Sequence, residues 1–291
     1  MPAHQVAQKI KEKSRLTKEE WREFTKTVWH IANTTHPEHP AVFPKEIPHR
    51  LIKLFTFHGE TVLDPFAGTG VTAAAGIPLG RRIICVDQNP RYAGIIRRTC
   101  SALRNGRPNH EALQVVRGDS RKLSFLADSS VQLIVSSPPY WDKANYGHGP
   151  ANLGAIRNYQ TFLDEVQKVF AECHRVLEPG RKICIVTANV NQHTEHGLLT
   201  FPLAADFAIR LRDVGFVLVS EIIWSKDGTG GRWGSWGRQR PIFGSYPYPP
   251  NFLFKNVHEY IVVGAKPPRA KTRGPKVKSY SDLMRHKSKQ R

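Results

Sequence analysis

The chain has 291 residues, of which 40% are hydrophobic, and this is enough to bury one sizeable core. It contains no run of about 18 apolar residues, which excludes a membrane-spanning helix of ordinary length, and residues 1–15 lack the apolar core of a signal peptide. We therefore expect a soluble, cytoplasmic protein with no membrane partner, folded as one domain with insertions.

The net charge of +19 points to a polyanionic partner. Residues 266–291 hold ten Lys or Arg against one acid, Asp282, so this stretch contributes +9 and the remainder +10. Because both parts are basic, nucleic acid fits better than a small acidic substrate. We expect residues 266–291 to form a flexible basic tail, although a solubilising terminus would have the same composition.

From residue 60 onward, strand-like apolar runs alternate with helix-like stretches. Strands are predicted within 60–70, 81–90, 113–120, 131–141, 182–190, 217–225 and 258–266, and helices within 71–80, 91–106, 159–180 and 201–216. This alternation predicts a doubly wound α/β sheet with ligands at the carboxyl ends of its strands. Ahead of it, residues 14–31 look like a helix with Thr17 and Glu20 in capping-box spacing.

The first predicted strand runs into a glycine-rich turn, "LDPFAGTG" at 63–70. Gly68 and Gly70 allow a tight turn and a close approach of a ligand to the backbone, and Asp64 and Phe66 flank that approach. A glycine-rich turn also occurs for structural reasons alone. No Gly-Lys-Ser/Thr follows, so this turn is not a P-loop.

Two further acids end the next two predicted strands. Asp87 sits where an acid binds ribose hydroxyls in nucleoside-binding sheets, or where a residue caps a helix. Asp119 could accept from an adenine amino group or serve as a turn residue. The series of acids at three successive strand ends favours a nucleoside cofactor over three separate structural roles.

The fourth predicted strand ends in "SSPPYW" at 136–141. Pro138 and Pro139 donate no backbone N–H and fix φ, so the chain leaves the sheet in a rigid extended turn. Ser137 stands on one side of the prolines, with Tyr140 and Trp141 on the other. Cys85 and Cys184 fall within strand patterns, and none of the four cysteines, which also include Cys100 and Cys173, forms a C-x-x-C pair, so we infer neither disulfides nor zinc.

The pair "LDPFAGTG" and "SSPPYW" resembles the amino-group DNA methyltransferases, which use S-adenosylmethionine to methylate N4 of cytosine or N6 of adenine. The resemblance covers most of residues 36–265 and implies a mostly parallel, seven-stranded Rossmann-like sheet with helices on both faces. "HPAVFP" at 39–44 resembles the family's segment at the methionine end of the cofactor. The implied cofactor-binding residues are Phe43, Pro44, Asp64, Pro65, Phe66, Ala67, Gly68, Thr69, Gly70, Asp87, Asp119 and Ser120.

The resemblance assigns catalysis to Ser137, Pro138, Pro139 and Tyr140. The Ser137 hydroxyl and the Pro138 carbonyl would each accept one hydrogen of the exocyclic amino group, and Tyr140 would stack on a base flipped out of the duplex. Cytosine C5 methylation is disfavoured because no cysteine follows a proline. In this family Ser before Pro-Pro favours cytosine N4, with adenine N6 as the alternative.

Residues 224–252 have neither helical nor strand period, and we expect them to recognise double-stranded DNA. Arginines there could read guanine or hold phosphates and aromatics could stack on bases, or the aromatics could pack on the sheet. The candidates are Arg232, Trp233, Trp236, Arg238, Arg240, Tyr246 and Tyr248. We divide the chain into an N-terminal helical extension (1–35), a methyltransferase domain (36–265) and the tail.

A nucleoid-associated protein of a prokaryote or phage, with a companion restriction endonuclease as a candidate partner, would suit this reading. Two alternatives are an RNA guanine-N2 methyltransferase and a non-catalytic DNA-binding protein on the same scaffold. The sequence shows no RNA-binding domain ahead of the glycine-rich turn, and the intact Gly68, Gly70, Ser137 and Tyr140 argue against a non-catalytic role.

Overall fold

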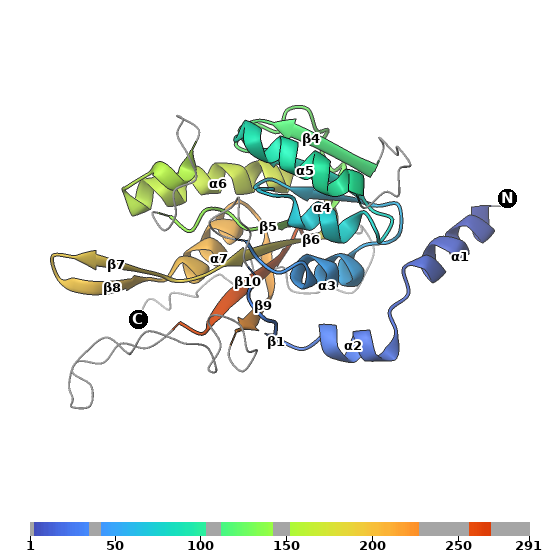
Figure 1. The fold of residues 1–291 in the computed structure, drawn as a ribbon, viewed down its shortest axis with the longest axis horizontal. Coiled ribbons are helices and arrows are strands. Elements are labelled where there is room, and N and C mark those ends of the chain that lie inside the picture. Colours follow the sequence, from blue (N-terminus) through green and yellow to red (C-terminus); the bar gives the residue numbers. More distant parts are fainter. Residues whose placement is uncertain (1–2, 35–41, 103–111, 142–151, 227–255, 269–291) are drawn as a thin grey trace, which may run out of the picture.

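Eight strands form one sheet in the order β1-β9-β10-β6-β5-β2-β3-β4 (Figure 1). The computed structural model describes residues 3–34, 42–102, 112–141, 152–226 and 256–268. All neighbouring pairs are parallel except the two made by β10, which runs antiparallel to both β6 and β9. The strands are β1 (Val28–His30), β2 (Thr61–Asp64), β3 (Arg82–Asp87), β4 (Leu113–Arg117), β5 (Val131–Ser136), β6 (Leu177–Thr187), β9 (Val217–Ser225) and β10 (His258–Ala265).

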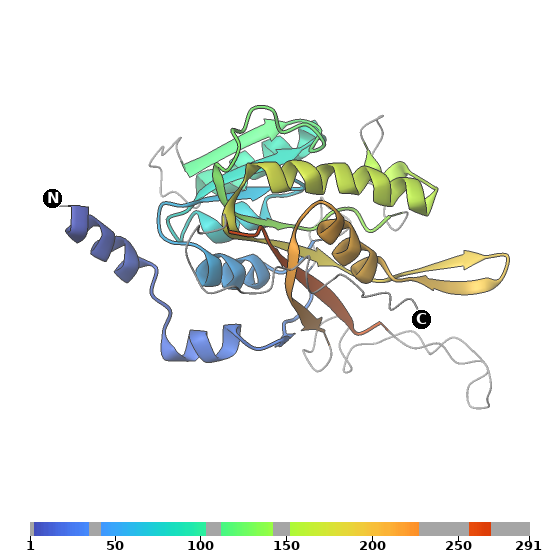
Figure 2. The same cartoon turned by 180° about the vertical axis from the view of Figure 1, so that it is seen from behind.

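Helices cover both faces of this sheet. Helices α3, α4 and α5 pack on one face, and α6 and α7 pack on the other, in front of the sheet in Figure 2. No helix in the described part of the chain is both long and apolar enough to cross a membrane. The helices are α1 (Ala3–Lys13), α2 (Lys18–Phe24), α3 (Glu46–Phe55), α4 (Val71–Gly76), α5 (Pro90–Ala102), the 3₁₀ turn η2 (Leu153–Ala155), α6 (Tyr159–Val176) and α7 (Leu203–Asp213).

The central strands are apolar on both faces, as buried parallel strands must be. In β5, Leu133 and Val135 face the core beneath α3–α5, whereas Ile134 faces the core beneath α6 and α7. Cys85 and Cys184 are fully buried in these strands, which confirms that they act as small hydrophobes. The expected doubly wound, mostly parallel sheet is therefore present, with one strand more than the seven expected.

The strand order reverses between β2 and β5. From β2 the chain moves outward through β3 to β4, and then returns to the other side of β2 as β5. In open α/β sheets, ligands bind outside the carboxyl ends of the strands at such a reversal. The glycine-rich turn after β2 and the Pro-Pro segment after β5 consequently leave the sheet side by side.

The additional strand comes from the N-terminal region. Helix α2 starts with the predicted capping box: Thr17 Oγ1 accepts from the Glu20 N–H, and the Glu20 carboxylate accepts from the Thr17 N–H. The helix ends at Phe24, and β1 then pairs in parallel with β9.

A helical extension over residues 1–35 is therefore wrong for its final part. Val28 and Trp29 are β-branched and aromatic, which favours an extended backbone. Pairing with β9 also leaves Trp29 only 1% exposed. Burial of an indole ring stabilises the fold more than an additional solvent-exposed helical turn would.

A hairpin that the sequence did not suggest follows β6. Strands β7 (Val190–Thr194) and β8 (Gly197–Phe201) form a separate antiparallel pair that projects from the body (Figures 1 and 2). It leaves the sheet at the carboxyl end of β6, the same edge as the glycine-rich turn. Phe201, expected at the start of a helix, is instead the last residue of β8.

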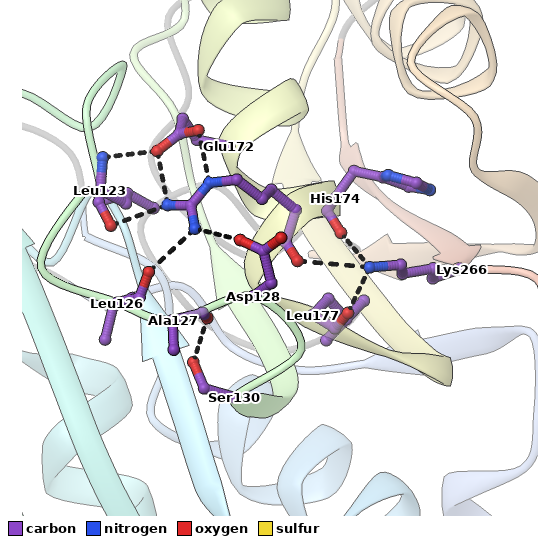
Figure 3. Close-up of polar contacts among 10 residues, drawn as sticks. Leu123, Leu126, Ala127, Asp128, Ser130, Glu172, His174, Leu177 and Lys266 are labelled. Carbon is purple, nitrogen blue, oxygen red and sulfur yellow. Dashed lines mark hydrogen bonds and ion pairs between the residues drawn. The ribbon is translucent and has the colours of Figure 1, made fainter.

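Lys266 belongs to the folded body, although the flexible tail was expected to begin there. Its backbone N–H donates to the Arg181 carbonyl at 3.0 Å. Its ammonium donates to the carbonyls of His174 and Leu177, each at 2.7 Å, and of Arg175 at 3.3 Å (Figure 3). The last carbonyls of a helix lack intrahelical partners and carry a partial negative charge, so a cation at the end of α6 stabilises them.

Beside Lys266, Arg175 fixes the connection between β4 and β5. Its guanidinium donates to the carbonyls of Leu123 and Leu126 and to the carboxylates of Glu172 and Asp128 (Figure 3). The carboxylates and these hydrogen bonds raise the pKa of Arg175. The end of α6 therefore holds the segment that leads into β5.

We expect Lys266→Met to lower the free energy of unfolding by about 2 kcal/mol, because three carbonyls lose a charge-assisted partner. Urea unfolding followed by far-UV circular dichroism measures this change. The matched control is Lys182→Met, since the Lys182 ammonium makes one exposed bond, to the Gly180 carbonyl. Equal effects of the two substitutions would contradict the role given to Lys266.

Candidate active site

The Asp64 carboxylate, at the end of β2, joins the two segments that the sequence singled out. Asp64 is 1% exposed. Its Oδ1 accepts from the Ser136 hydroxyl at 2.6 Å and from the Phe66 N–H at 3.1 Å, and its Oδ2 accepts from the Thr72 hydroxyl at 2.6 Å. The Phe66 N–H also lies 3.2 Å from Ser136 Oγ. One buried carboxylate thus binds β2, the glycine-rich turn, α4 and the end of β5 together.

This burial changes the acid strength of Asp64. Removal from water raises the pKa of Asp64 to about 6, against the hydrogen bonds from Ser136, Thr72 and Phe66, which lower it. The negative charge of nearby Asp87 also contributes to this rise in the pKa of Asp64. Both carboxylate oxygens are engaged inside the protein, so Asp64 supports the turn from beneath.

Two glycines shape the turn itself. Gly68 has φ +48° and Gly70 has φ +86°, in the left-handed region that side chains with a Cβ rarely adopt. A Cβ on Gly70 would also lie 2.9 Å from Ile96 Cγ1. Gly70 is therefore explained by backbone conformation and by packing against α5, in addition to any role toward a ligand.

Asp87, at the end of β3, faces the turn. Its Oδ2 accepts from the Gly68 N–H at 2.9 Å and its Oδ1 from the Asn89 N–H at 2.8 Å. Burial raises the pKa of Asp87, and these two N–H donors oppose that rise. Each carboxylate oxygen can accept a second hydrogen bond, as recognition of ribose hydroxyls requires.

Asp119 and Ser120 follow β4. Asp119 accepts from the Arg121 guanidinium through both oxygens, between 2.7 and 3.0 Å, and from the Arg121 N–H at 3.0 Å. Burial raises the pKa of Asp119, but the bonds from Arg121 outweigh it and the pKa is lowered. Ser120 is buried, and its hydroxyl donates to the Pro65 carbonyl. Asp119 is thus a paired turn residue, and Ser120 anchors the glycine-rich turn.

The Pro-Pro segment leaves β5 beside this turn. Pro138 is buried, whereas Ser137, Pro139 and Tyr140 are half-buried. The Ser137 hydroxyl lies 3.3 Å from the Tyr140 hydroxyl, which donates to Glu259 Oε2 at 2.8 Å. The sequence did not suggest Glu259, although a carboxylate within the apolar run of β10 was a usable signal.

Trp141 anchors the other end of this segment. Its φ of +51° is strained for a residue with a Cβ, and the residue is 7% exposed. Ring centroids lie 4.9 Å from Tyr159, at the start of α6, and 4.7 Å from Phe201, at the base of the hairpin. Tyr159 in turn donates to Asp206 of α7 at 2.6 Å. Aromatic packing therefore fixes where the Pro-Pro segment ends.

Some of the remaining predicted site residues lie in the described part of the chain and others do not. Phe43 and Pro44 are buried at the start of α3, and Pro65, Phe66, Ala67 and Thr69 lie in the turn. The seven recognition candidates between Arg232 and Tyr248 lie outside the described residues, as does the tail beyond residue 268. Ser136 and Thr72 were missed, because only the fold reveals that they converge on Asp64.

Comparison with known proteins gives one family. A family model described as DNA methylase, of the N6 and N4 type, matches residues 2–98 and 131–291. The Type II methyltransferase M.BglI of Bacillus subtilis is 40% identical over 83 residues, which are 28% of this chain and 24% of that protein. M.MjaI of Methanocaldococcus jannaschii, also a Type II methyltransferase, is 47% identical over 76 residues, which are 24% of this chain and 25% of that protein.

Two further proteins are similar to this chain over about half of its length. DNA adenine methyltransferase YhdJ of Escherichia coli is 29% identical over 46% of this chain and 40% of its own length. A candidate DNA modification methylase from Thermus thermophilus, solved with S-adenosyl-L-methionine, is 34% identical over 54% of this chain and 57% of that chain, with a TM-score of 0.39. The chain spans about a quarter of the length of M.BglI and M.MjaI.

We expect Asp64→Asn to flatten part of the pH dependence of stability. Because the folded pKa of about 6 exceeds the ordinary 3.8, the folded protein holds this proton more tightly than the unfolded chain. The contribution of Asp64 is therefore full below pH 4 and is lost as the pH rises through 6. About two pKa units correspond to about 3 kcal/mol.

Urea unfolding of the wild type and of Asp64→Asn between pH 4 and pH 7 measures this difference. The unfolding free energy of the wild type relative to the variant should fall by about 2 to 3 kcal/mol over that range, since all other titrating groups are shared. A difference that stays constant with pH would show that Asp64 titrates normally.

Proposed function

This chain belongs to the N6/N4 DNA methylase family, and on that premise we propose that it transfers a methyl group from S-adenosylmethionine to the exocyclic N4 of cytosine in double-stranded DNA. The family match covers more than half of the chain. Because the chain spans only part of its curated relatives, its activity, substrate and partners are part of the proposal.

The observation that carries the proposal is the bond between Ser136 and Asp64. It holds the carboxyl ends of β5 and β2 against each other at the strand reversal. The glycine-rich turn, which would hold a methyl donor, and Ser137, which would hold an acceptor base, then leave adjacent strands. Methyl transfer requires donor and acceptor to be held in this way.

The residues around the turn fit a nucleoside cofactor. Asp87 offers carboxylate oxygens with remaining acceptor capacity, and Gly68 carries no side chain over the turn. S-adenosylmethionine, when bound, supplies an electrophilic methyl group on a sulfonium. Asp64, Thr72 and Ser120 would hold the backbone of the turn in place, without contact with the cofactor through their side chains.

The Pro-Pro segment would prepare the amino group. An exocyclic amino nitrogen is a poor nucleophile because its lone pair is delocalised into the ring. Acceptors at the Ser137 hydroxyl and the Pro138 carbonyl would each bind one amino hydrogen, orient the nitrogen and localise its electron density. The prolines and the packed Trp141 ring keep these acceptors rigid.

The choice between the two amino groups rests on Ser137. A serine before Pro-Pro favours cytosine N4 in this family. The similarity to a DNA adenine methyltransferase, YhdJ, supports adenine N6 as the second candidate.

Double-stranded DNA is the proposed substrate because the chain carries a net charge of +19, its family is described as DNA methylase, and it is similar to a DNA adenine methyltransferase. We assign base recognition to the Arg and aromatic residues within 224–252, and sequence-independent phosphate attraction to the basic residues after 266. The resemblance to Type II methyltransferases also makes a companion restriction endonuclease a proposed partner.

Nucleoside mass spectrometry of DNA incubated with the protein and S-adenosylmethionine tests the reaction. We expect N4-methylcytosine from the wild type, and a single-turnover rate about 10- to 1000-fold lower for Ser137→Ala, since one preorganised acceptor is lost. Ser130→Ala, at the other end of β5, is the matched control. N6-methyladenine as the product would establish the second candidate, and an unchanged rate would remove Ser137 from the mechanism.

Asp87→Ala should weaken binding of S-adenosylmethionine by about 10- to 100-fold, because a charged acceptor for ribose hydroxyls is lost. Isothermal titration calorimetry measures the affinity without DNA. Asp164→Ala is the control, since Asp164 is an exposed carboxylate on α6. Wild-type affinity in a folded Asp87→Ala variant would show that the cofactor does not use this carboxylate.

A further inference from the structure

A series of hydrogen bonds through Tyr140 links Ser137 to Glu259 and Lys226, which have no role in the proposed reaction as described above. The Ser137 and Tyr140 hydroxyls are 3.3 Å apart, and Tyr140 donates to Glu259 Oε2 at 2.8 Å. The other oxygen of Glu259 accepts from the Lys226 ammonium. Strand β10 provides Glu259, and Lys226 directly follows β9, so the sheet itself holds this pair behind the Pro-Pro segment.

The ion pair is well enclosed. The side chains of Lys226 and Glu259 are each 13% exposed, and the Lys226 ammonium lies 4.6 Å from the centroid of the Trp224 ring. Because both side chains are largely removed from water, separating the ammonium from the carboxylate would leave unpaired buried charges at a large cost in free energy. The carboxylate is therefore held in one position, with one oxygen toward Lys226 and the other toward Tyr140.

This arrangement fixes the direction of the hydrogen bonds. A carboxylate only accepts, so the single hydroxyl hydrogen of Tyr140 points to Glu259. The Tyr140 oxygen can then only accept from Ser137, which commits the Ser137 hydrogen to Tyr140. Both lone pairs of the Ser137 oxygen remain for another donor.

We propose that Glu259 is a positioning residue, held by Lys226, which makes the Ser137 hydroxyl an acceptor for the amino group of the target base. The inference rests on the proposed function, because its final step is the binding of that amino group. A Ser137 hydroxyl whose hydrogen pointed toward the amino group would place two hydrogen-bond donors against each other and would repel the base. A serine hydroxyl can donate or accept, and the Pro-Pro sequence alone does not decide which. Glu259 makes the Ser137 hydroxyl an acceptor from β10, which is separated from β5 by β6.

Glu259→Gln provides the sharpest test because it keeps the size of the side chain. Lys226 can only donate, so the single amide oxygen of the glutamine must face Lys226 and its NH₂ must face Tyr140. Tyr140 then accepts from the glutamine and turns its own hydrogen toward Ser137. The Ser137 hydrogen is released toward the base, and the intended acceptor becomes a donor.

We expect Glu259→Gln to lower the single-turnover methyl-transfer rate by about 10- to 1000-fold, the range for loss of one preorganised acceptor. The affinity for S-adenosylmethionine should stay within about twofold of wild type. Adding Lys226→Met to Glu259→Gln removes the donor that orients the amide, so the rate should recover at least about fivefold. A merely structural ion pair predicts the opposite, that losing both partners is no better than losing one.

The matched control is Glu221→Gln, because Glu221 is an exposed carboxylate on β9. We expect this control to retain the wild-type rate. A wild-type rate in Glu259→Gln, or no recovery in the double variant, would overturn the inference.

A second measurement does not depend on methyl transfer. In protein labelled with ¹³C at tyrosine Cζ, the Tyr140 signal, assigned by its loss in Tyr140→Phe, should shift in Glu259→Gln and not in Glu221→Gln. A Tyr140 signal that is unmoved in Glu259→Gln would overturn the inference. If the wild type methylates no DNA and yet this signal shifts, the proposed function fails while the hydrogen-bond direction stands.

Discussion

The Asp64 carboxylate is the constraint on which the rest of the site depends. Two loops at the end of a sheet have no intrinsic reason to hold a fixed relation, because each could move on its own strand. Here one carboxylate accepts from Ser136 on β5, from Phe66 in the glycine-rich turn and from Thr72 on α4. The strand reversal between β2 and β5 brings these three donors within reach. A methyl donor on one loop and an acceptor base on the other would inherit the same fixed relation, without any domain closure.

Such a centre is maintained at a cost in stability that the surrounding core offsets. A buried carboxyl is less favourable than an apolar side chain, as the raised pKa of Asp64 shows, and the left-handed backbone at Trp141 is strained. The cores on both faces of the sheet and the rings of Trp141, Tyr159 and Phe201 hold these features in place. Unfavourable local features that persist in a well-packed structure commonly mark functional positions. Here they coincide with the two motifs that carry the proposed chemistry.

The polar groups of the site act at different depths. Asp64, Thr72 and Ser120 are buried and hold the backbone, whereas Asp87 keeps acceptor capacity at the surface of the turn. Glu259 lies on β10, two strands from β5, and its proposed role is to set the direction of the hydrogen bond between Tyr140 and Ser137. The three acids at successive strand ends therefore differ in their surroundings: Asp64 supports the turn, Asp119 is paired with Arg121, and Asp87, for which we propose cofactor recognition, accepts from two backbone N–H groups. The sequence pattern could not distinguish the three acids, because each follows a predicted strand in the same way. Their hydrogen-bond partners differ because several of them come from other segments of the chain.

Local sequence determined the periodic elements, the capping box at Thr17 and Glu20, the glycine-rich turn and the rigid exit after Ser137, since each depends on backbone preferences within a few residues. It also determined the order of β/α units, and hence the doubly wound class. Only the tertiary structure decided that Val28–His30 joins the sheet, that Lys266 closes α6 and that Ser136 meets Asp64. Glu259 reaches Tyr140 across 119 positions of sequence, and Lys226 reaches Glu259 from the neighbouring strand. Such contacts arise from strand order and register, which bring together residues far apart in the sequence. The residues adjacent to each one in the chain do not indicate which partner it will meet.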